Sequence, residues 1–389
     1  MVCSQRIQGL PDKTKSTVGD EPAAPDKKLQ TRLTLGPGRK PYGKYQFKNL
    51  TPVAWAKEHS LVKHSILYPA VLEHAAALIG KTPWEVSRSA TLLAQAHIRA
   101  HEIYAHSPVV CGIDVYHAEV EAWGGEVRPQ SHAQTPALTR PLFENVSDIL
   151  NLPALDPEHN GRFPMFCAAA SAISGKFSCE VQVPVGGPVS LAIGLLGFEN
   201  LLLEFAESTA AIGAVIAFLA RHQAGLCAKL IALGFRPAIY ESGAAPPLVS
   251  PEIFQRIVAP ALSEVLQAGR AAGRPLTCII GGNVALIAEA MLRCGPGYVI
   301  CPAETDQVAF MRAALKFPEI AVRVNMPASV LASGDRMAIN RTIDRLLPLA
   351  LDHPRGLLGT GVVPFDCQPA WVLDAQRYAG QRITEIGGR

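Results

Sequence analysis

The stretch Leu276-Thr277-Cys278-Ile279-Ile280-Gly281 decides the fold that this sequence predicts. Its run of apolar and β-branched residues, stopped by glycine, is typical of a buried strand. A helical pattern follows at Val284–Arg293, and another apolar run of strand length, Tyr298–Cys301, follows the helix. A strand, a helix and a second strand in this order predict a parallel unit with the helix packed on the sheet.

The same alternation extends through most of the chain. Five more apolar runs of strand length are found at Val109–Asp114, Glu180–Val185, Arg236–Glu241, Ile320–Asn325 and Gly356–Gly361. Other helical patterns lie at Leu92–His106, Asn200–Leu233, Pro251–Ala271, Asp306–Leu315 and Arg336–Leu351. Ser250 and Asp335 are expected to cap the helices that follow them. With an eighth strand expected in the first hundred residues, the sequence predicts a single (β/α)8 TIM-type barrel, and an open doubly wound sheet is the alternative.

Composition limits the class of protein. With 389 residues, 49% of them hydrophobic and 18% charged, the chain can form one large core. Its longest apolar stretch, residues 209–220, has 12 residues, whereas a membrane span needs about 20. The nine cysteines are odd in number and form no Cys-x-x-Cys pair, which favours reduced thiols in the cytoplasm. The sequence has no Walker loop and no Gly-x-Gly-x-x-Gly fingerprint, which disfavours enzymes that cradle phosphates.

Charge divides the chain into two parts. Residues 1–44 contain nine Lys and Arg against four Asp and Glu, whereas the whole chain has a net charge of only +3. We therefore predict a flexible basic N-terminal extension at residues 1–45 and a barrel domain at residues 46–389. Because the barrel domain is slightly acidic, it shows no electrostatic footprint for nucleic acid.

Polar side chains follow the predicted strands at the end where TIM-type barrels place their active sites. The candidates are Asp114, His117 and Glu119 after the first recognised strand, Tyr240 and Glu241 at the third, Cys278 and Asn283 at the fourth, Asn325 at the sixth and Cys367 after the last. Several of them have structural alternatives. Cys278 could be a core residue and Asn283 could cap the next helix, while Glu119 could be a solvated or ion-paired carboxylate and His117 a surface residue. Acids, a thiol and amides at one opening suit proton transfer, metal binding or a neutral bulky cofactor better than a polyanion.

Four segments resemble one known family in the same order along the chain. Glu119-Val120-Glu121-Ala122-Trp123-Gly124 is similar to a Glu-Ala-Glu-Ala-Leu-Gly segment of the uroporphyrinogen decarboxylase superfamily, specifically its methylcobalamin-dependent methyltransferase branch. Residues 187–192 resemble its Gly-Pro-Phe-Thr-Leu segment, and residues 248–254 resemble its Leu-Ile-Ser-Pro-x-x-Phe helix start. Ser333-Gly334-Asp335 lies where that family has Gly-Thr-Pro. The resemblance covers roughly Pro52 to Ala379 and implies a (β/α)8 barrel, in agreement with the strand pattern.

One departure from the family concerns the decarboxylase reaction itself. True uroporphyrinogen decarboxylases have an N-terminal Arg-Gln-Ala-Gly-Arg segment that grips the substrate carboxylates, and this chain has no such segment. Asp114 lies near the position of the family's pyrrole-binding aspartate. Without those arginines, we expect Asp114 to orient a different substrate or to support the structure.

A second departure concerns zinc. Methyltransferases of the resembling branch bind zinc through His-x-Cys and a later Cys, and the zinc activates the acceptor thiol. The corresponding residues here are Cys278, Ile280 and Thr360, so that zinc site is broken, since isoleucine cannot bind a metal. A rearranged zinc site formed by Glu241, Cys278 and Cys367 is the remaining hypothesis for a metal.

The resemblance implies a corrinoid-dependent methyltransferase that moves a methyl group between a small methylated substrate and a corrinoid. Because no Asp-x-His-x-x-Gly corrinoid-binding segment is present, a partner protein is expected to carry the corrinoid. Catalytic roles are predicted for Glu119, Glu241 and Cys278. Substrate-binding roles are predicted for five further residues, Asp114, His117, Tyr240, Asn283 and Asn325.

Two alternatives stay open at this point. The first is a decarboxylase or lyase of the same superfamily that acts on a small acid, with Asp114 and Glu241 handling protons. The second is a catalytically degenerate barrel that binds a ligand or a corrinoid protein.

Overall fold

The computed structural model describes residues 67–387, so the predicted extension at residues 1–45 lies outside the described residues. Eight parallel strands form the main sheet in the order β1-β10-β9-β8-β7-β6-β5-β2. Their bounds are β1 (Leu67–Ala70), β2 (Val109–Val110), β5 (Val181–Gly186), β6 (Arg236–Tyr240), β7 (Thr277–Ile279), β8 (Tyr298–Cys301), β9 (Ala321–Met326) and β10 (Gly356–Val362). The first strand pairs with the last, and the others follow one another round the sheet in chain order. This order is that of a (β/α)8 barrel and excludes the doubly wound sheet.

The sheet curls into a barrel whose ring of hydrogen bonds stops short between two strands. Within residues 67–387, no ladder joins β1 to β2, which form the two ends of the strand order. Near this gap, Gln376 Nε2 of α16 (Pro369–Gly387) joins β1 to the end of α4 (Ala90–Tyr104), because it donates to the carbonyl oxygens of Leu67 at 3.0 Å and Tyr104 at 2.9 Å.

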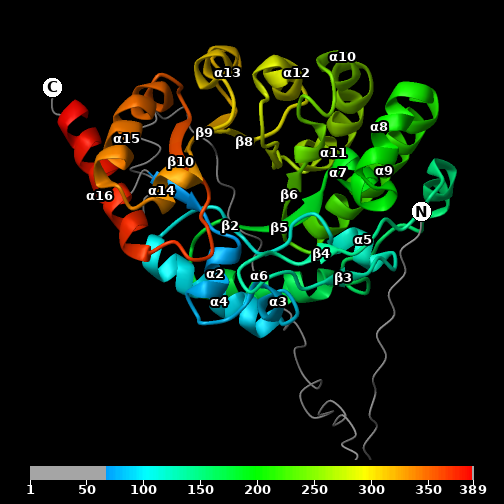
Figure 1. Cartoon of the computed structure of the whole chain (residues 1–389), viewed down its shortest axis with the longest axis horizontal. Coiled ribbons are helices and arrows are strands. Elements are labelled where there is room, and N and C mark those ends of the chain that lie inside the picture. The colour runs from blue at the N-terminus through cyan, green and yellow to red at the C-terminus, as the bar shows by residue number, and fades with distance from the viewer. Residues whose placement is uncertain (1–66, 388–389) are drawn as a thin grey trace, which may run out of the picture. The chain divides into compact units, whose positions relative to one another are not determined.

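Helices surround the strands as an outer layer (Figure 1). The α-helices are α2 (Glu73–Ala77), α3 (Pro83–Val86), α4 (Ala90–Tyr104), α5 (Ala118–Ala122), α6 (Phe163–Lys176), α7 (Pro188–Leu196), α8 (Phe198–Glu207), α9 (Thr209–Ala232), α10 (Pro251–Ile253), α11 (Ala259–Ala271), α12 (Ala288–Arg293), α13 (Gln307–Ala314), α14 (Ala328–Ala332), α15 (Arg336–Leu351) and α16 (Pro369–Gly387). Shorter elements are the antiparallel pair β3 (Val127–Arg128) and β4 (Ala137–Leu138), the 3-10 turns η1 (Val146–Asn151), η2 (Ser242–Ala244) and η4 (Ala285–Ile287), and the π-helical segment η3 (Phe254–Val258).

Most predicted elements are confirmed, and two helix caps form as expected. The Ser250 hydroxyl accepts a hydrogen bond from the N–H of Ile253 at 3.2 Å, with Pro251 in the first helical position. Asp335 accepts hydrogen bonds from the N–H groups of Met337 and Ala338, and α15 has the predicted bounds. The eighth strand, expected in the first hundred residues, is β1.

Two predicted elements are corrected. The strand predicted at Val109–Asp114 stops at Val110, because its neighbour β5 contains Pro184, which has no N–H to continue the ladder. The helix predicted at Asn200–Leu233 is two helices, α8 and α9. They are separated by Ser208, whose φ of −133° and ψ of 47° are not helical.

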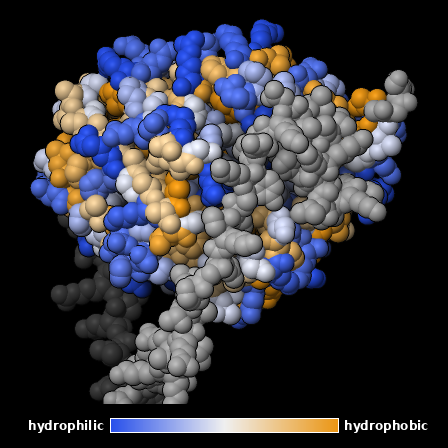
Figure 2. Space-filling view, turned by 180° about the vertical axis from the view of Figure 1, so that it is seen from behind, coloured by the Kyte–Doolittle hydropathy of each residue, from blue (hydrophilic) through white to orange (hydrophobic). Residues whose placement is uncertain are grey.

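The long helix α9 differs from the sequence-based prediction, which found no membrane span. With 24 residues and a mean hydropathy of 1.4, α9 is long and apolar enough to cross a membrane, which the 12-residue apolar stretch did not indicate. In this fold, however, it is an outer helix of the barrel, and the core buries its residues Ile212, Val215, Ile216, Leu219, Leu226 and Leu230. Figure 2 shows one face of the surface, on which hydrophilic side chains are mixed with small hydrophobic areas.

Alternation along the strands separates an inner face from an outer one. The outward residues join the main core between strands and helices, which includes Ile239 and Cys278. The inward residues form a second, small cluster in the barrel lumen, built on Val115, Ala238 and Tyr240. Partly buried Leu72, Val110, Tyr116 and Ile279 pack against this lumen cluster.

Candidate active site

The carboxyl ends of the strands hold most of the predicted site residues. β2 is followed by Asp114 and His117, β6 by Glu241, and Asn325 is in the last part of β9. In TIM-type barrels this end carries the catalytic groups, so we take it as the candidate active site.

Glu241 lies directly after β6 and binds the start of α7. Its Oε1 accepts hydrogen bonds from the Ser190 N–H at 2.8 Å and the Ser190 hydroxyl at 3.0 Å, and its Oε2 accepts from the Val189 N–H at 3.0 Å. Burial raises the pKa of this carboxyl to about 7, although those three hydrogen bonds lower it. The close approach requires Gly187, since a Cβ at that position would lie 2.1 Å from Oε2.

Glu119, on α5, holds the same turn between β5 and α7. Its Oε1 accepts hydrogen bonds from the Gly186 N–H at 2.7 Å and from Gln223 Nε2 at 3.0 Å. Its Oε2 is buried and has no hydrogen-bond partner within the described chain, and burial raises the pKa of the carboxyl. The structure thus brings Glu119 and Glu241 together, but at a backbone turn, and neither side chain is exposed to solvent.

Cys278 faces the helices and not the lumen. It belongs to the main core, whereas its neighbour Ile279 packs in the lumen cluster. Burial raises the pKa of its thiol well above the ordinary value, and Cys294 and Glu241 raise it further. A neutral thiol in apolar surroundings is a poor nucleophile, so this placement is that of a core residue.

Asp114 is neutralised by a buried arginine that sequence reasoning missed. Arg162, just before α6, donates from its two terminal nitrogens to the two oxygens of Asp114, each at 2.6 Å. Its Nε donates to Glu121 at 2.6 Å, and Arg88 also pairs with Glu121. Both oxygens of Asp114 are therefore occupied.

His117 lies at the edge of this ion-pair cluster. Its Nδ1 is 4.0 Å from the Asp114 carboxylate and has no hydrogen-bond partner among the described residues. Burial lowers the pKa of the ring, which keeps the imidazole neutral near pH 7.

Ser242 links two loops at the carboxyl ends of the strands. Its hydroxyl oxygen accepts hydrogen bonds from the Tyr116 hydroxyl at 2.8 Å and from the Gly281 N–H at 3.0 Å. The ring of Tyr116 packs edge-to-face on Tyr240, with 6.0 Å between centroids. Tyr240 was predicted for the site, but Tyr116 was missed because it stands in a loop with no strand pattern.

Asn283 is exposed and does not cap the following helix with its side chain. Instead, the Thr305 hydroxyl accepts a hydrogen bond from the Ala285 N–H at 2.8 Å and donates one to Asn283 Oδ1 at 3.2 Å. The capping alternative for Asn283 is therefore wrong, because a threonine from the β8–α13 loop takes the position.

Asn325 faces the lumen beside Arg323, which sequence reasoning also missed. Both side chains are buried, and Arg323 Nε donates to Asn325 Oδ1 at 2.9 Å. A signal for Arg323 was present in the sequence, since two polar residues two apart in an otherwise apolar strand share one face.

Comparison with known proteins gives the family. The family model for uroporphyrinogen decarboxylase matches residues 68–364, which is most of the chain. The chain belongs to the uroporphyrinogen decarboxylase family. Among solved structures 27 chains match, including a methyltransferase from Methanosarcina mazei with a TM-score of 0.69 and 17% sequence identity, over 87% of this chain and 100% of that chain. A search of curated proteins finds no match.

The zinc site implied by the methyltransferase branch of the family does not fit this chain. Of the three corresponding residues, Cys278 and Ile280 lie in the core, and the Thr360 hydroxyl donates to the Gly361 carbonyl at 2.6 Å. Among residues 67–387, no group of three or more His, Cys, Asp or Glu side chains could hold a metal ion. The rearranged set of Glu241, Cys278 and Cys367 is therefore not brought together as a metal site.

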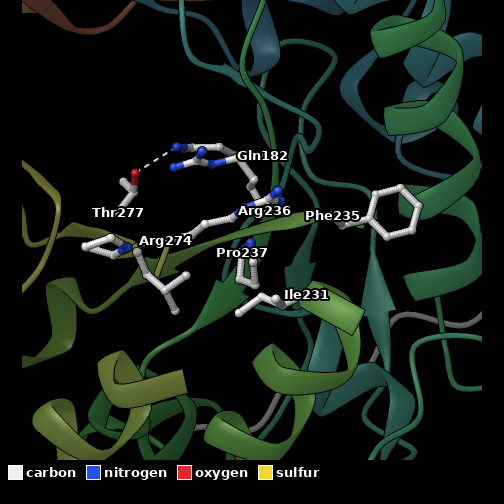
Figure 3. Close-up of a pocket in the computed structure, with 9 residues that line it drawn as sticks. Gln182, Ile231, Phe235, Arg236, Pro237, Arg274 and Thr277 are labelled. Atoms are coloured by element: carbon white, nitrogen blue, oxygen red, sulfur yellow. Dashed lines mark hydrogen bonds between the residues drawn. The ribbon is translucent and has the colours of Figure 1, made fainter. Parts of the chain in front are cut away.

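Figure 3 shows a pocket at the opposite end of the strands, around Arg236, Arg274 and Thr277. Gln182 donates to the Thr277 hydroxyl at 2.7 Å inside it. Its volume is about 10 Å³, room for no more than one water molecule. Active sites of this barrel class lie at the carboxyl ends of the strands, so this pocket is not the candidate site.

Proposed function

We propose that this protein is a corrinoid-dependent methyltransferase that moves a methyl group between a small substrate and a corrinoid held by a partner protein. The observation that carries this proposal is the likeness of the barrel to the whole length of a methyltransferase chain, within a family match over residues 68–364. The described cysteines are all free, which fits the reducing cytoplasm that we include in the proposal.

Asp114 argues against a porphyrinogen as the substrate. The family's decarboxylases use an aspartate near this position to accept pyrrole N–H groups. Here both oxygens of Asp114 already accept from Arg162, and the side chain has no exposed surface. Freeing Asp114 would leave a buried arginine with fewer partners, which is unfavourable by several kcal/mol.

The proposed transfer balances as a displacement at the methyl carbon. When bound by its partner protein, a corrinoid would supply the electron pair for the new bond to the methyl carbon, and the leaving atom of the substrate would keep the electron pair of the broken bond and take up a proton. The barrel contributes placement of the substrate and exclusion of water. The groups of this chain suited to contact the substrate are His117, Tyr116 and Tyr240, together with Asn325 in the lumen.

Glu119 and Glu241 enter the proposal as positioning residues. Their oxygens accept hydrogen bonds from the backbone of residues 186–190, the turn from which β5 enters α7, and within residues 67–387 they form no hydrogen bond to a lumen side chain. Their role in the proposal is to keep this edge of the site rigid. Cys278 acts as a packing residue of β7.

A test is to mix the purified protein with free cob(I)alamin and a panel of methylated ethers, amines and thioethers. The proposal predicts that at least one donor changes the cobalt absorption spectrum to that of the methylated form, with enzyme and donor both required. Release of carbon dioxide from small acids without any spectral change would favour the decarboxylase instead. No change of either kind would favour a barrel that only binds.

A further inference from the structure

Arg323 is a buried positive charge in the centre of the barrel lumen. It lies on β9 between Ala321 and Asn325, on the strand face opposite to Val322 and Val324, which belong to the main core. The residue is only 8% exposed. Guanidinium groups cannot lose their proton in proteins, so this charge persists at any physiological pH.

The arginine is directed toward the carboxyl end of the barrel. Its Nε donates to Asn325, two residues further along the strand in that direction. Its stem passes over Gly359 on β10, where a Cβ would lie 2.3 Å from Arg323 Cδ and 2.7 Å from the Tyr68 carbonyl oxygen. The neighbouring strand therefore leaves room for this one side chain, and Nε of Arg323 lies at the level of Asn325.

No carboxylate of the described chain neutralises Arg323. Among the ion pairs within residues 67–387 none involves Arg323, and its hydrogen bonds go to neutral groups, the Asn325 amide and the Tyr298 hydroxyl. Arg162 makes the contrast clear, because at 7% exposure it is paired with both Asp114 and Glu121. Buried charges in proteins are normally paired, so the guanidinium lacks the partner that such a group requires.

The polar groups next to this charge are neutral ones. The buried hydroxyl of Tyr298 lies within hydrogen-bonding reach of Arg323. Burial raises the pKa of Tyr298 and of Tyr240, and the Arg323 charge opposes that rise at both. Glu180, the acid whose charge raises the pKa of Tyr298, is itself paired with Arg236 at 3.3 Å.

We propose that Arg323, with Asn325 and Tyr298, forms a subsite for the carboxylate of a small substrate. A carboxylate supplies the missing negative charge and matches the planar donors of the guanidinium. The place of this subsite in catalysis rests on the proposed function, in which the substrate would be a methylated compound that also carries a carboxylate. Binding of a carboxylate at this subsite does not depend on the proposed function, and it is tested without a corrinoid.

The test measures binding of methoxyacetate and of its neutral amide to the full chain by calorimetry and thermal shift. Methoxyacetate should bind and raise the melting temperature, whereas the amide should bind about tenfold more weakly or not at all, since a charged hydrogen bond is lost. Equal binding of acid and amide, or no binding of either, overturns the proposal. Tighter binding of inorganic phosphate than of methoxyacetate overturns the carboxylate assignment.

Variants locate the subsite. Arg323→Gln should weaken methoxyacetate binding by about tenfold or more, whereas Arg341→Gln, which removes the same charge from the exposed face of α15, should leave binding unchanged. Unchanged binding in folded Arg323→Gln contradicts the subsite. If that variant does not fold, Arg323→Lys takes its place, and it should bind severalfold more weakly because the planar fork is lost. Unchanged affinity of Arg323→Lys for methoxyacetate would also contradict the subsite.

Discussion

Arg162 and Arg323 are two buried arginines of the same barrel, and removing them should change the stability of the protein in different ways. Their exposed fractions are 7% and 8%, but Arg162 holds Asp114 and Glu121, whereas Arg323 has no acid partner among the described residues. Removing a buried charge is harmful when its partner is left behind, and nearly neutral or favourable when no partner exists. The stability of the protein should therefore respond differently to the two substitutions.

Arg162→Gln is predicted to lower the free energy of unfolding by about 3–5 kcal/mol, since it leaves Asp114 buried without its cation. Arg323→Gln is predicted to change it by less than about 1 kcal/mol, or to raise it. Urea denaturation of both variants beside the wild type measures the difference. Equal destabilisation by the two substitutions would show that Arg323 has an internal partner and would remove the basis for the anion subsite.

Glu241 predicts a pH dependence of stability. Burial raises the pKa of its carboxyl to about 7, so between the ordinary value of 4.5 and about 7 the folded chain binds a proton that the unfolded chain has released. The contribution of this group to stability is then full below pH 4.5 and is lost as the pH rises toward and through 7. Its loss over that window is on the order of 3 kcal/mol.

Glu241→Gln removes this titration, so its unfolding free energy should fall less than that of the wild type between pH 5 and 7.5. Glu264→Gln, on the exposed face of α11, is the matched control and should follow the wild type. A wild-type curve parallel to that of Glu241→Gln across the window would mean that the carboxyl is already ionised at low pH.

At the scale of elements, the turn between β5 and α7 depends on a close approach of backbone and carboxylate. Gly187→Ala would place a Cβ 2.1 Å from Glu241 Oε2 and should lower the free energy of unfolding by about 1–3 kcal/mol. Gly225→Ala, in the middle of α9, meets nothing within 4 Å and should raise it by about 0.5–1 kcal/mol. Thermal denaturation of the two variants measures the contrast. Tolerance of Gly187→Ala without loss would argue against a fixed Glu241.

The bounds of elements could be predicted wherever local signals were strong. Tyr298–Cys301 and α15 have the predicted ends because an apolar run and an Asp cap mark them. The early strand Val109–Asp114 could not be bounded in this way, because its length is limited by Pro184 on a neighbouring strand about 70 residues later. A strand end that is set by pairing with another strand cannot be predicted from the residues next to it in the sequence.

At the scale of the whole molecule, the barrel is joined at β1 by α16 as well as by β10. Gln376→Leu removes two buried hydrogen bonds, to Leu67 and Tyr104, and should lower the free energy of unfolding by about 1–2 kcal/mol. Gln381→Leu, exposed on the same helix, is the control and should have little effect. Chemical denaturation compares them, and equal effects would show that the junction does not depend on Gln376.

The sequence predicted the barrel and the end that carries the candidate site, because alternating strands and helices determine both. It could not determine which way a side chain faces. Cys278 is on the outer face of its strand, while Arg323, absent from the predicted set, is on the inner face. Nor could it show that Asp114 is neutralised, because its partner Arg162 is 48 residues away in the chain.

The most direct test of the account follows an isotope-labelled methyl group from methoxyacetate to cob(I)alamin in a single turnover. We predict labelled methylcobalamin with the wild type and with Arg341→Gln, and methyl transfer slower by about tenfold or more with Arg323→Gln. Release of carbon dioxide without labelled methylcobalamin, or methyl transfer at the same rate in all three proteins, would contradict the proposal.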